Sequence, residues 1–193
     1  MRWAGLPTMP WASMPVELQF PFPMTPDGAL VAEVFLVEDD REMVGVGPSR
    51  DALPSRLRVN PGLANRVERR RLPTGDAVLV AHVTAAGEAP VAGAPQTGTK
   101  IVLDQLIERQ TAADMVASLR DGRLRQQTYY MAATGCKGLV LIVEGDLDAA
   151  TENGANVREE AKNVLAELTV SSNFVFNNTA DLTETAALFS SLV

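Results

Sequence analysis

Acidic residues stand at four places where an apolar stretch of the sequence starts or stops. Magnesium and similar hard cations bind carboxylate oxygens and keep several water molecules, so two or three converging acids can form a site. A cation held in this way can activate a water molecule and stabilise charge that develops on a phosphoryl group. The residues with this potential are Asp39 with Glu42, Asp76, Asp104 with Glu108, and Asp114.

The single histidine and the single cysteine of the chain argue against several other chemistries. His82 alone is too little for a histidine zinc site or a Ser-His-Asp triad on one chain. Cys136 alone excludes an internal disulfide framework and fits a reducing compartment. Catalysis would therefore rest on carboxylates, lysine and arginine. The structural explanation for His82 is a strand or loop residue without a catalytic role, and for Cys136 a small apolar filler near a turn.

Each acid also has an ordinary structural explanation. Asp114 lies three residues after Thr111, which is the spacing of a capping box at a helix start. Asp39 and Glu42 could be solvated loop residues, and Asp76 could be part of an ordinary Gly-Asp turn. Glu108 could form an exposed surface pair with Arg109 at a strand end.

The order of the expected elements brings the acids to one edge of a sheet. Apolar and β-branched runs predict strands over residues 31–37 (ending in an acidic loop at 38–40), 67–72, 77–83, 100–107, 139–143 and 173–176. Helical periodicity predicts helices over 111–119, 124–133, 157–168 and 181–192, with a short helix at most within 48–62 and a long loop over 84–99. Early strands followed by alternating helices and strands indicate an α/β sheet covered on both faces. Strand ends meet at one edge of such a sheet, where ligands bind.

The size and composition of the chain fit one domain with an appendage. The chain has 193 residues and no run of the roughly 18 apolar residues that a membrane helix needs, so no membrane residence is expected. Prolines interrupt residues 1–24, and we expect an irregular extension over residues 1–28 followed by a single domain over 29–193. The net charge of −7 disfavours a nucleic-acid partner, although acids that hold a metal are neutralised in the working site. The basic residues are clustered at Arg66, Arg69, Arg70 and Arg71, and again at Arg120, Arg123 and Arg125.

The joint order of the motifs resembles the signature of the XPF/Mus-type structure-specific endonuclease family. That signature has a Gly-Asp pair, a spacer, and then Glu-Arg-Lys with an acid four residues further on. The matching residues are Gly75-Asp76, Leu103-Asp104, Glu108-Arg109-Gln110 and Asp114, with a similar continuation over 118–127. Residues 141–144 and 174–187 also look like later parts of the family pattern. The long loop before Leu103 points to the Mus branch, the crossover junction endonucleases, and the resemblance covers the nuclease domain only.

The resemblance implies a restriction-endonuclease-like fold, a mixed α/β central sheet with helices on both faces. It implies cleavage of branched DNA such as 3′ flaps, forks and junctions with Mg²⁺ or Mn²⁺, in the nucleus, together with a non-catalytic partner subunit of the Eme type. Carried over by position, Asp39, Asp76 and Glu108 look like the metal ligands, with Glu42 as a supporting acid. Arg109 would stabilise phosphate charge, and Asp114 would support the site from the helix start.

One position departs from the family signature, because Gln110 replaces its lysine. A lysine there would help to position the attacking water and balance negative charge, and glutamine keeps only the hydrogen bonding. The segment after Gln127 also lacks the basic residues that family members usually have there, and this weakens the expected binding of phosphate groups. The sequence therefore leaves open a catalytically impaired nuclease-like scaffold for DNA binding or heterodimerisation. It also leaves open an unrelated α/β domain whose acids are solvated surface residues.

Overall fold

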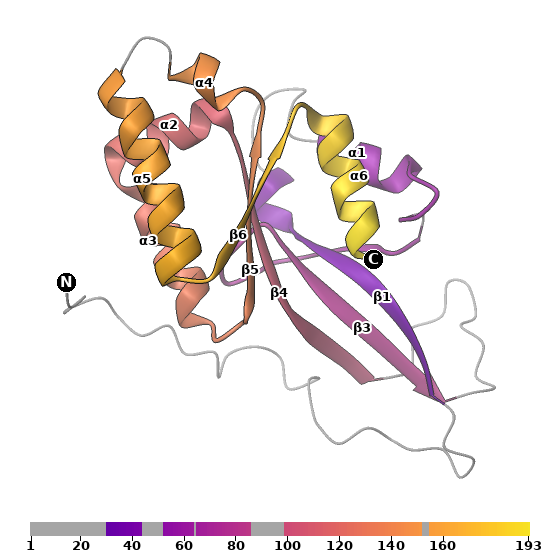
Figure 1. Ribbon diagram of the computed structural model, residues 1–193. Coiled ribbons are helices and arrows are strands. Elements are labelled where there is room, and N and C mark those ends of the chain that lie inside the picture. The colour runs from indigo at the N-terminus through magenta and orange to yellow at the C-terminus, as the bar shows by residue number, and fades with distance from the viewer. Residues whose placement is uncertain (1–29, 44–51, 64, 86–98, 152–154) are drawn as a thin grey trace.

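A mixed sheet of six strands forms the centre of the protein (Figure 1). The computed structural model describes residues 30–43, 52–63, 65–85, 99–151 and 155–193. The strand order is β2-β1-β3-β4-β5-β6. Strand β3 runs antiparallel to both β1 and β4, and the other neighbours are parallel. The strands are β1 (Leu30–Asp39), β2 (Val67–Arg70), β3 (Ala77–Ala85), β4 (Thr99–Thr111), β5 (Gly138–Glu144) and β6 (Phe174–Thr179).

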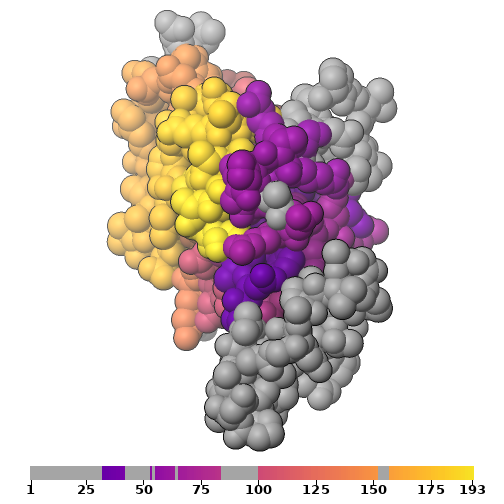
Figure 2. Space-filling view, turned by 90° about the vertical axis from the view of Figure 1, so that its right-hand side faces the viewer, coloured from indigo at the N-terminus to yellow at the C-terminus, as the bar shows by residue number. Residues whose placement is uncertain are grey.

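Helices cover both faces of the sheet. On one face lie α2 (Ala112–Asp121), α3 (Arg123–Ala133) and α5 (Ala155–Ser171), with the short α4 (Leu147–Ala150) beside them. On the other face, α1 (Ala52–Val59) and α6 (Leu182–Leu192) pack side by side, as Figure 2 shows from outside. A 3-10 helix, η2 (Asp40–Met43), follows β1 directly.

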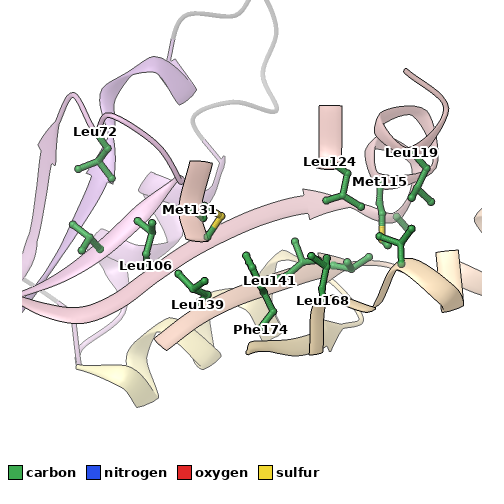
Figure 3. Close-up of a cluster of buried hydrophobic side chains, with 14 of the residues drawn as sticks. Leu72, Leu106, Met115, Leu119, Leu124, Met131, Leu139, Leu141, Leu168 and Phe174 are labelled. Atoms are coloured by element: carbon green, nitrogen blue, oxygen red, sulfur yellow. The ribbon is translucent and has the colours of Figure 1, made fainter. Parts of the chain in front are cut away.

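Each face of the sheet has its own hydrophobic cluster. The larger cluster joins the sheet to α2, α3 and α5 through side chains such as Met115, Leu124 and Leu168 (Figure 3). The smaller cluster joins it to α1 and α6 and contains Phe189, which is 1% exposed. Successive residues of β5 alternate between the two clusters, because side chains along a strand point to opposite faces. A strand buried on both faces reads as the continuous apolar run seen at 139–143.

Local capping signals set the helix boundaries that the sequence predicts. The Thr111 hydroxyl accepts a hydrogen bond from the Asp114 N–H and starts α2, and Gly122 ends it with φ of 80°. Asp181 accepts from the backbone N–H groups of Thr183 and Glu184, and the Glu184 carboxylate accepts from Ala180 N at 2.6 Å. Asp181 therefore caps the N-terminus of α6, and Glu184 reaches back to the residue before the cap.

The fold class and most elements agree with the sequence, but several element ends differ. Strand β2 ends at Arg70 rather than at 72, β6 continues to Thr179 rather than ending at 176, and α5 spans Ala155–Ser171 rather than 157–168. Two further differences concern strands that line the candidate site. The strand expected to stop at Ile107 continues to Thr111, because β4 pairs with β5 from Gln105 to Thr111. The stretch expected as an acidic loop begins as strand, since Glu38 and Asp39 are the last residues of β1 and pair with β2. In both cases the pairing with a neighbouring strand extends the element beyond its apolar run. Helix α4 was not predicted.

Two predictions fall on parts of the chain that lie outside the described residues. These are the irregular extension over residues 1–28 and most of the loop over 84–99. Within the described part of the chain, none of the helices combines the length and apolar character needed to cross a bilayer.

Candidate active site

A cavity of about 630 Å³ opens at the edge of the sheet where β1 ends, β3 begins and β4 enters α2. Its walls combine carboxylates with the guanidinium groups of Arg69, Arg109 and Arg123. The sheet order brings the ends of β1, β3 and β4 together, because the antiparallel register pairs Glu38 with Ala77 and Ala77 with Ile107. The acids that line the cavity are Glu38, Asp39, Asp76, Glu108, Asp114 and Glu144.

Asp39 is buried at the end of β1 and is paired with Arg41. Its Oδ1 accepts from Arg41 N at 3.1 Å, and its Oδ2 accepts from Arg41 Nε at 2.7 Å and from Arg41 Nη2. The hydrogen bond to Asp39 raises the pKa of the Arg41 guanidinium. Arg41 Nη2 also donates to the Leu72 carbonyl at 2.7 Å. Asp39 therefore lines the cavity with both oxygens occupied by an arginine.

Asp76 is fixed to the backbone of β4 at two points. Its N–H donates to the Ile107 carbonyl at 2.8 Å, and its Oδ2 accepts from the Arg109 N–H at 2.7 Å. Its own carbonyl accepts from Asp39 N at 2.8 Å, which ties it to β1 as well. Gly75, with φ of 75°, turns the chain into this position, and a side chain there would meet Leu106 at 2.8 Å. The Gly-Asp pair is thus both a turn and a cavity wall.

Glu108 is 4% exposed and points to the α2 and α3 side of the sheet. Its Oε1 accepts from Gln127 Nε2 at 2.7 Å, so α3 holds the carboxylate in place. The side chain lines the same cavity as Asp76. Burying a carboxylate is costly unless it has partners, and Glu108 is almost fully buried. This disfavours the explanation of Glu108 as part of an exposed ion pair at a strand end.

Arg109 points to the opposite face of the sheet and forms an ion pair with Glu144. Its Nε and Nη2 donate to both Glu144 oxygens at 3.1–3.2 Å. Glu144 in turn accepts from the Thr185 hydroxyl at 2.9 Å, and Thr185 shares a 2.6 Å hydrogen bond with Thr179. Among the described residues, Arg109 Nη1 has no hydrogen-bond partner, and the Arg109 side chain is 18% exposed. This edge of the guanidinium remains for a ligand in the cavity.

Gln110 returns to the Glu108 side of the sheet and contacts α2. Its Oε1 accepts from the Ser118 hydroxyl at 2.9 Å, and the same hydroxyl lies 2.9 Å from the Met115 carbonyl. Gln110 Nε2 is buried and has no hydrogen-bond partner in the described part of the chain. The residue at the lysine position of the family signature therefore offers an uncharged N–H at the cavity wall.

Asp114 has both of the roles that its spacing suggests. It belongs to the capping interaction of α2, since its Oδ2 accepts from the Thr111 hydroxyl at 2.6 Å. It also lines the cavity from the first turn of that helix. Negative charge at a helix start is stabilised by the helix dipole, so Asp114 needs no metal to be stable there.

Several residues singled out from the sequence do not reach the cavity. Asp104 is exposed and lies 3.9 Å from Lys137 on the surface. His82 is buried in β3, where it stacks on Phe35 and lies 3.2 Å from Glu68, and Cys136 packs against the larger cluster. Both residues thus have structural roles. The prediction for the Glu42 side chain lies outside the described residues.

The donor chemistry of Asp76 and Glu108 fits a hard cation. Among the residues that the structure describes, no group of three or more His, Cys, Asp or Glu side chains is arranged to hold a metal ion. The pairing of Asp39 with Arg41 gives a physical reason, because that carboxylate is already occupied. Magnesium needs only one or two protein carboxylates when water completes its shell. Asp76 and Glu108 could supply these from adjacent strand ends.

The sequence did not single out some residues that build the cavity. Arg69 appeared only as part of a basic cluster, and Glu144 only as part of a motif match. Ser118 and Gln127 appeared only in the family-like continuation after Asp114. Their roles depend on contacts between residues far apart in the chain, such as Glu144 with Thr185, and no spacing rule reveals those.

The sheet and the acidic edge define a restriction-endonuclease-like fold. Solved structures support this class, since the XPF of Aeropyrum pernix in complex with DNA superposes with a TM-score of 0.56. It is 24% identical in sequence, and the superposition covers 83% of this chain and 63% of that one. A second structure of the same XPF gives a TM-score of 0.57 at 23% identity, covering 81% of this chain and 62% of that one. At this identity the likeness concerns the fold.

The chain belongs to the ERCC4 domain family, whose pattern matches residues 39–192. Relatives include the crossover junction endonuclease MUS81 of Oryza sativa, 34% identical over 59% of this chain and 15% of that protein. The mus-81 endonuclease of Neurospora crassa is 35% identical over 58% of this chain and 16% of its own length. The human structure-specific endonuclease subunit MUS81 is 31% identical over 61% of this chain and 20% of that protein. The chain thus spans about a sixth of the length of the first two relatives. These matches confirm the family resemblance.

Proposed function

We propose that this chain is the nuclease domain of a metal-dependent, structure-specific DNA endonuclease that hydrolyses phosphodiesters in 3′ flaps, forks and junctions. The observation that carries the proposal is the single cavity that Asp76, Glu108 and Arg109 all line. Relatives named as crossover junction endonucleases support the choice of branched DNA. An Eme-type partner subunit and a nuclear location are also part of the proposal.

The residues of the cavity divide the work of such a reaction. Asp76 and Glu108 would hold Mg²⁺ or Mn²⁺, which when bound supplies an activated water and neutralises phosphate charge. Gln127 keeps the Glu108 carboxylate oriented through its 2.7 Å hydrogen bond. Glu144 keeps the Arg109 guanidinium oriented, so its remaining N–H groups can meet a phosphate oxygen. Leu182 and Phe189 are among the apolar residues of the wall and would limit the water that surrounds these charges.

Cleavage of labelled 3′-flap DNA tests the proposal. The full chain, alone and with an Eme-type subunit, is incubated with the flap in Mg²⁺ or Mn²⁺, and products are resolved on a denaturing gel. We expect cuts near the branch point that disappear when the cation is chelated. Glu108→Gln is the control, because it keeps the side-chain shape and a hydrogen-bonding oxygen for Gln127 while removing the charge. Equal cleavage by wild type and this variant would mean that the cavity is not the active site.

The second candidate function is that of a scaffold without catalytic turnover, and Gln110 is the observation that favours it. The buried amide supplies hydrogen bonding but no charge where the family signature has lysine. On this alternative, the chain would bind DNA or a partner subunit as a scaffold. Because both alternatives share the same fold, only a rate measurement separates them.

Restoring the lysine is expected to raise the cleavage rate. In Gln110→Lys, an ammonium group enters the cavity beside several acids, and the rate should rise by up to roughly 10²–10³-fold, the effect of one well-placed electrostatic group. The measurement is single-turnover cleavage of the flap under saturating enzyme. Gln110→Met is the matched control, since it has a similar length and no charge. If wild type already cuts at the rate of the lysine variant, the scaffold alternative fails.

A further inference from the structure

Arg69 is a positively charged residue in the cavity lining, and the proposed reaction gives it no role. It lies on β2, the edge strand of the sheet, and the register pairs it with Glu38 of β1. Its side chain is 13% exposed and lines the same cavity as Asp76 and Glu108. Its neighbour Arg70 is more exposed and forms an ion pair with Glu68 at 3.2 Å. Of the basic cluster at 66–71, Arg69 is the residue found in the lining of the cavity.

The hydrogen-bonding edge of Arg69 is unused. Its Nε and Nη2 are buried and have no hydrogen-bond partner in the described part of the chain. The nearest carboxylate oxygen, Glu38 Oε2, lies 4.0 Å from Nε, which is an ion-pair distance and too long for a hydrogen bond. A buried charged donor without an acceptor raises the free energy of the folded protein.

Comparison with Arg109 shows what this edge can bind. Nε and Nη2 form the fork with which a guanidinium grips two oxygens of a carboxylate or a phosphate. Arg109 uses its fork on Glu144, at 3.2 and 3.1 Å. The fork of Arg69 lies at ion-pair distance from Glu38 but makes no hydrogen bond in the described part of the chain, so it can still donate to a further oxyanion.

The order of strands places the two arginines on opposite sides of the acids. Along the edge of the sheet, β2 carries Arg69, β1 carries Asp39, the start of β3 follows Asp76, and β4 carries Glu108 and Arg109. Neighbouring strands lie about 4.8 Å apart, so β2 and β4 are roughly 14 Å apart. If Arg109 contacts one phosphate of a nucleic-acid strand near the acids, Arg69 would lie near a different phosphate of the same strand.

We propose that Arg69 binds a phosphate of the DNA strand on the β2 side of the cavity, adjacent to the phosphate that is cleaved. This inference rests on the proposed function and deepens it, because it gives the cavity a second, flanking phosphate position. Arg69 is here a substrate-positioning residue. Its loss should weaken the hold on DNA more than it alters the chemical step.

The test is a measurement of DNA binding by the full chain in the presence of Ca²⁺, a cation that can occupy sites made of oxygen ligands. Cleavage is monitored in a separate experiment. In Arg69→Gln, fluorescence anisotropy should show roughly tenfold weaker binding of flap DNA, the loss expected for one charged hydrogen-bonding contact. The slope of log affinity against log salt should become shallower by about 0.9, the contribution of one duplex phosphate contact. Arg70→Gln is the matched control for net charge and should change neither quantity to the same extent.

Neutral phosphate substitution locates the contact. Methylphosphonates are placed one at a time on either side of the cleavage position, and binding is measured for wild type and Arg69→Gln. We expect one flanking substitution to weaken wild type and to have no effect on the variant, as a double-mutant cycle requires of two groups in contact. If every substitution affects both proteins equally, the inference is overturned. Glu38→Gln with Arg69→Gln removes both charges, so a folding defect from an uncompensated Glu38 can be recognised.

The failure of this inference and the failure of the nuclease proposal look different. Binding that depends on Arg69 without any cleavage would overturn the nuclease and keep the phosphate position. If wild type and Arg69→Gln both cleave the DNA and bind it with equal affinity, the phosphate position is overturned and the nuclease proposal stands. Should the chain bind no DNA, titration with inorganic phosphate decides, followed by NMR at the Arg69 Nε–H group. A shift of that signal supports the anion position, and an unchanged signal overturns it.

Discussion

Replacing Asp76 with asparagine is expected to lower the rate of flap cleavage by roughly 10²–10³-fold, the cost of removing one oriented charge from an active site. The variant keeps an amide oxygen that can still accept from Arg109 N, the 2.7 Å bond of the native carboxylate. The backbone bond from Asp76 N to Ile107 is also unaffected. The substitution therefore removes the charge while retaining the local turn.

Two measurements separate this prediction from a loss of folding. Calorimetric titration with Mn²⁺ should show weaker binding to Asp76→Asn, and thermal unfolding should show a melting temperature close to wild type. Asp104→Asn is the matched control, because Asp104 is exposed, does not line the cavity and lies 3.9 Å from Lys137 on the surface. Unchanged Mn²⁺ affinity in Asp76→Asn would remove Asp76 from the metal site.

Truncation of Phe189 to alanine is expected to lower the free energy of unfolding by about 3–5 kcal/mol, the range for a large aromatic side chain in a core. Phe189 is 1% exposed and lies in the cluster that joins α6 to α1 and to the sheet. It also lines the cavity, as Arg109 and Glu144 do, so a void there would loosen the cavity wall. Cleavage should therefore fall together with stability.

Chemical denaturation followed by circular dichroism measures the change in stability. Val170→Ala serves as the control, because Val170 is 85% exposed and surface substitutions usually change stability by less than about 0.5 kcal/mol. A loss below about 1 kcal/mol in Phe189→Ala would show that the α1–α6 layer is not a tightly packed part of the core.

The sequence predicted the sheet well, because its signals were local. The buried strands β3 and β5 are continuous apolar runs, and Thr111, Gly122 and Asp181 mark helix ends by their own chemistry. It misplaced the ends of β1 and β4. The polar residues Glu38 and Glu108 extend these strands because neighbouring strands pair with them, and pairing partners are not visible in a local window.

The candidate site was predicted in part for the same reason. Asp39, Asp76, Glu108, Gln110 and Asp114 all line one cavity, as strand ends at a common edge should. The partners that occupy them could not be predicted. Arg41 on Asp39 and Glu144 on Arg109 change what each side chain can offer, and both follow from the packed structure.

The double attachment of Asp76 to β4 has a consequence for the energetics of cation binding. Its N–H and its carboxylate grip the residues on either side of Glu108, namely Ile107 and Arg109. The relative position of the two acids is therefore set by a single stretch of paired backbone, before any ion arrives. If this site holds a cation as proposed, binding would cost little reorganisation energy, and the site would resist adaptation to an ion of different radius. Selectivity among divalent cations would then be a property of the β3–β4 register itself.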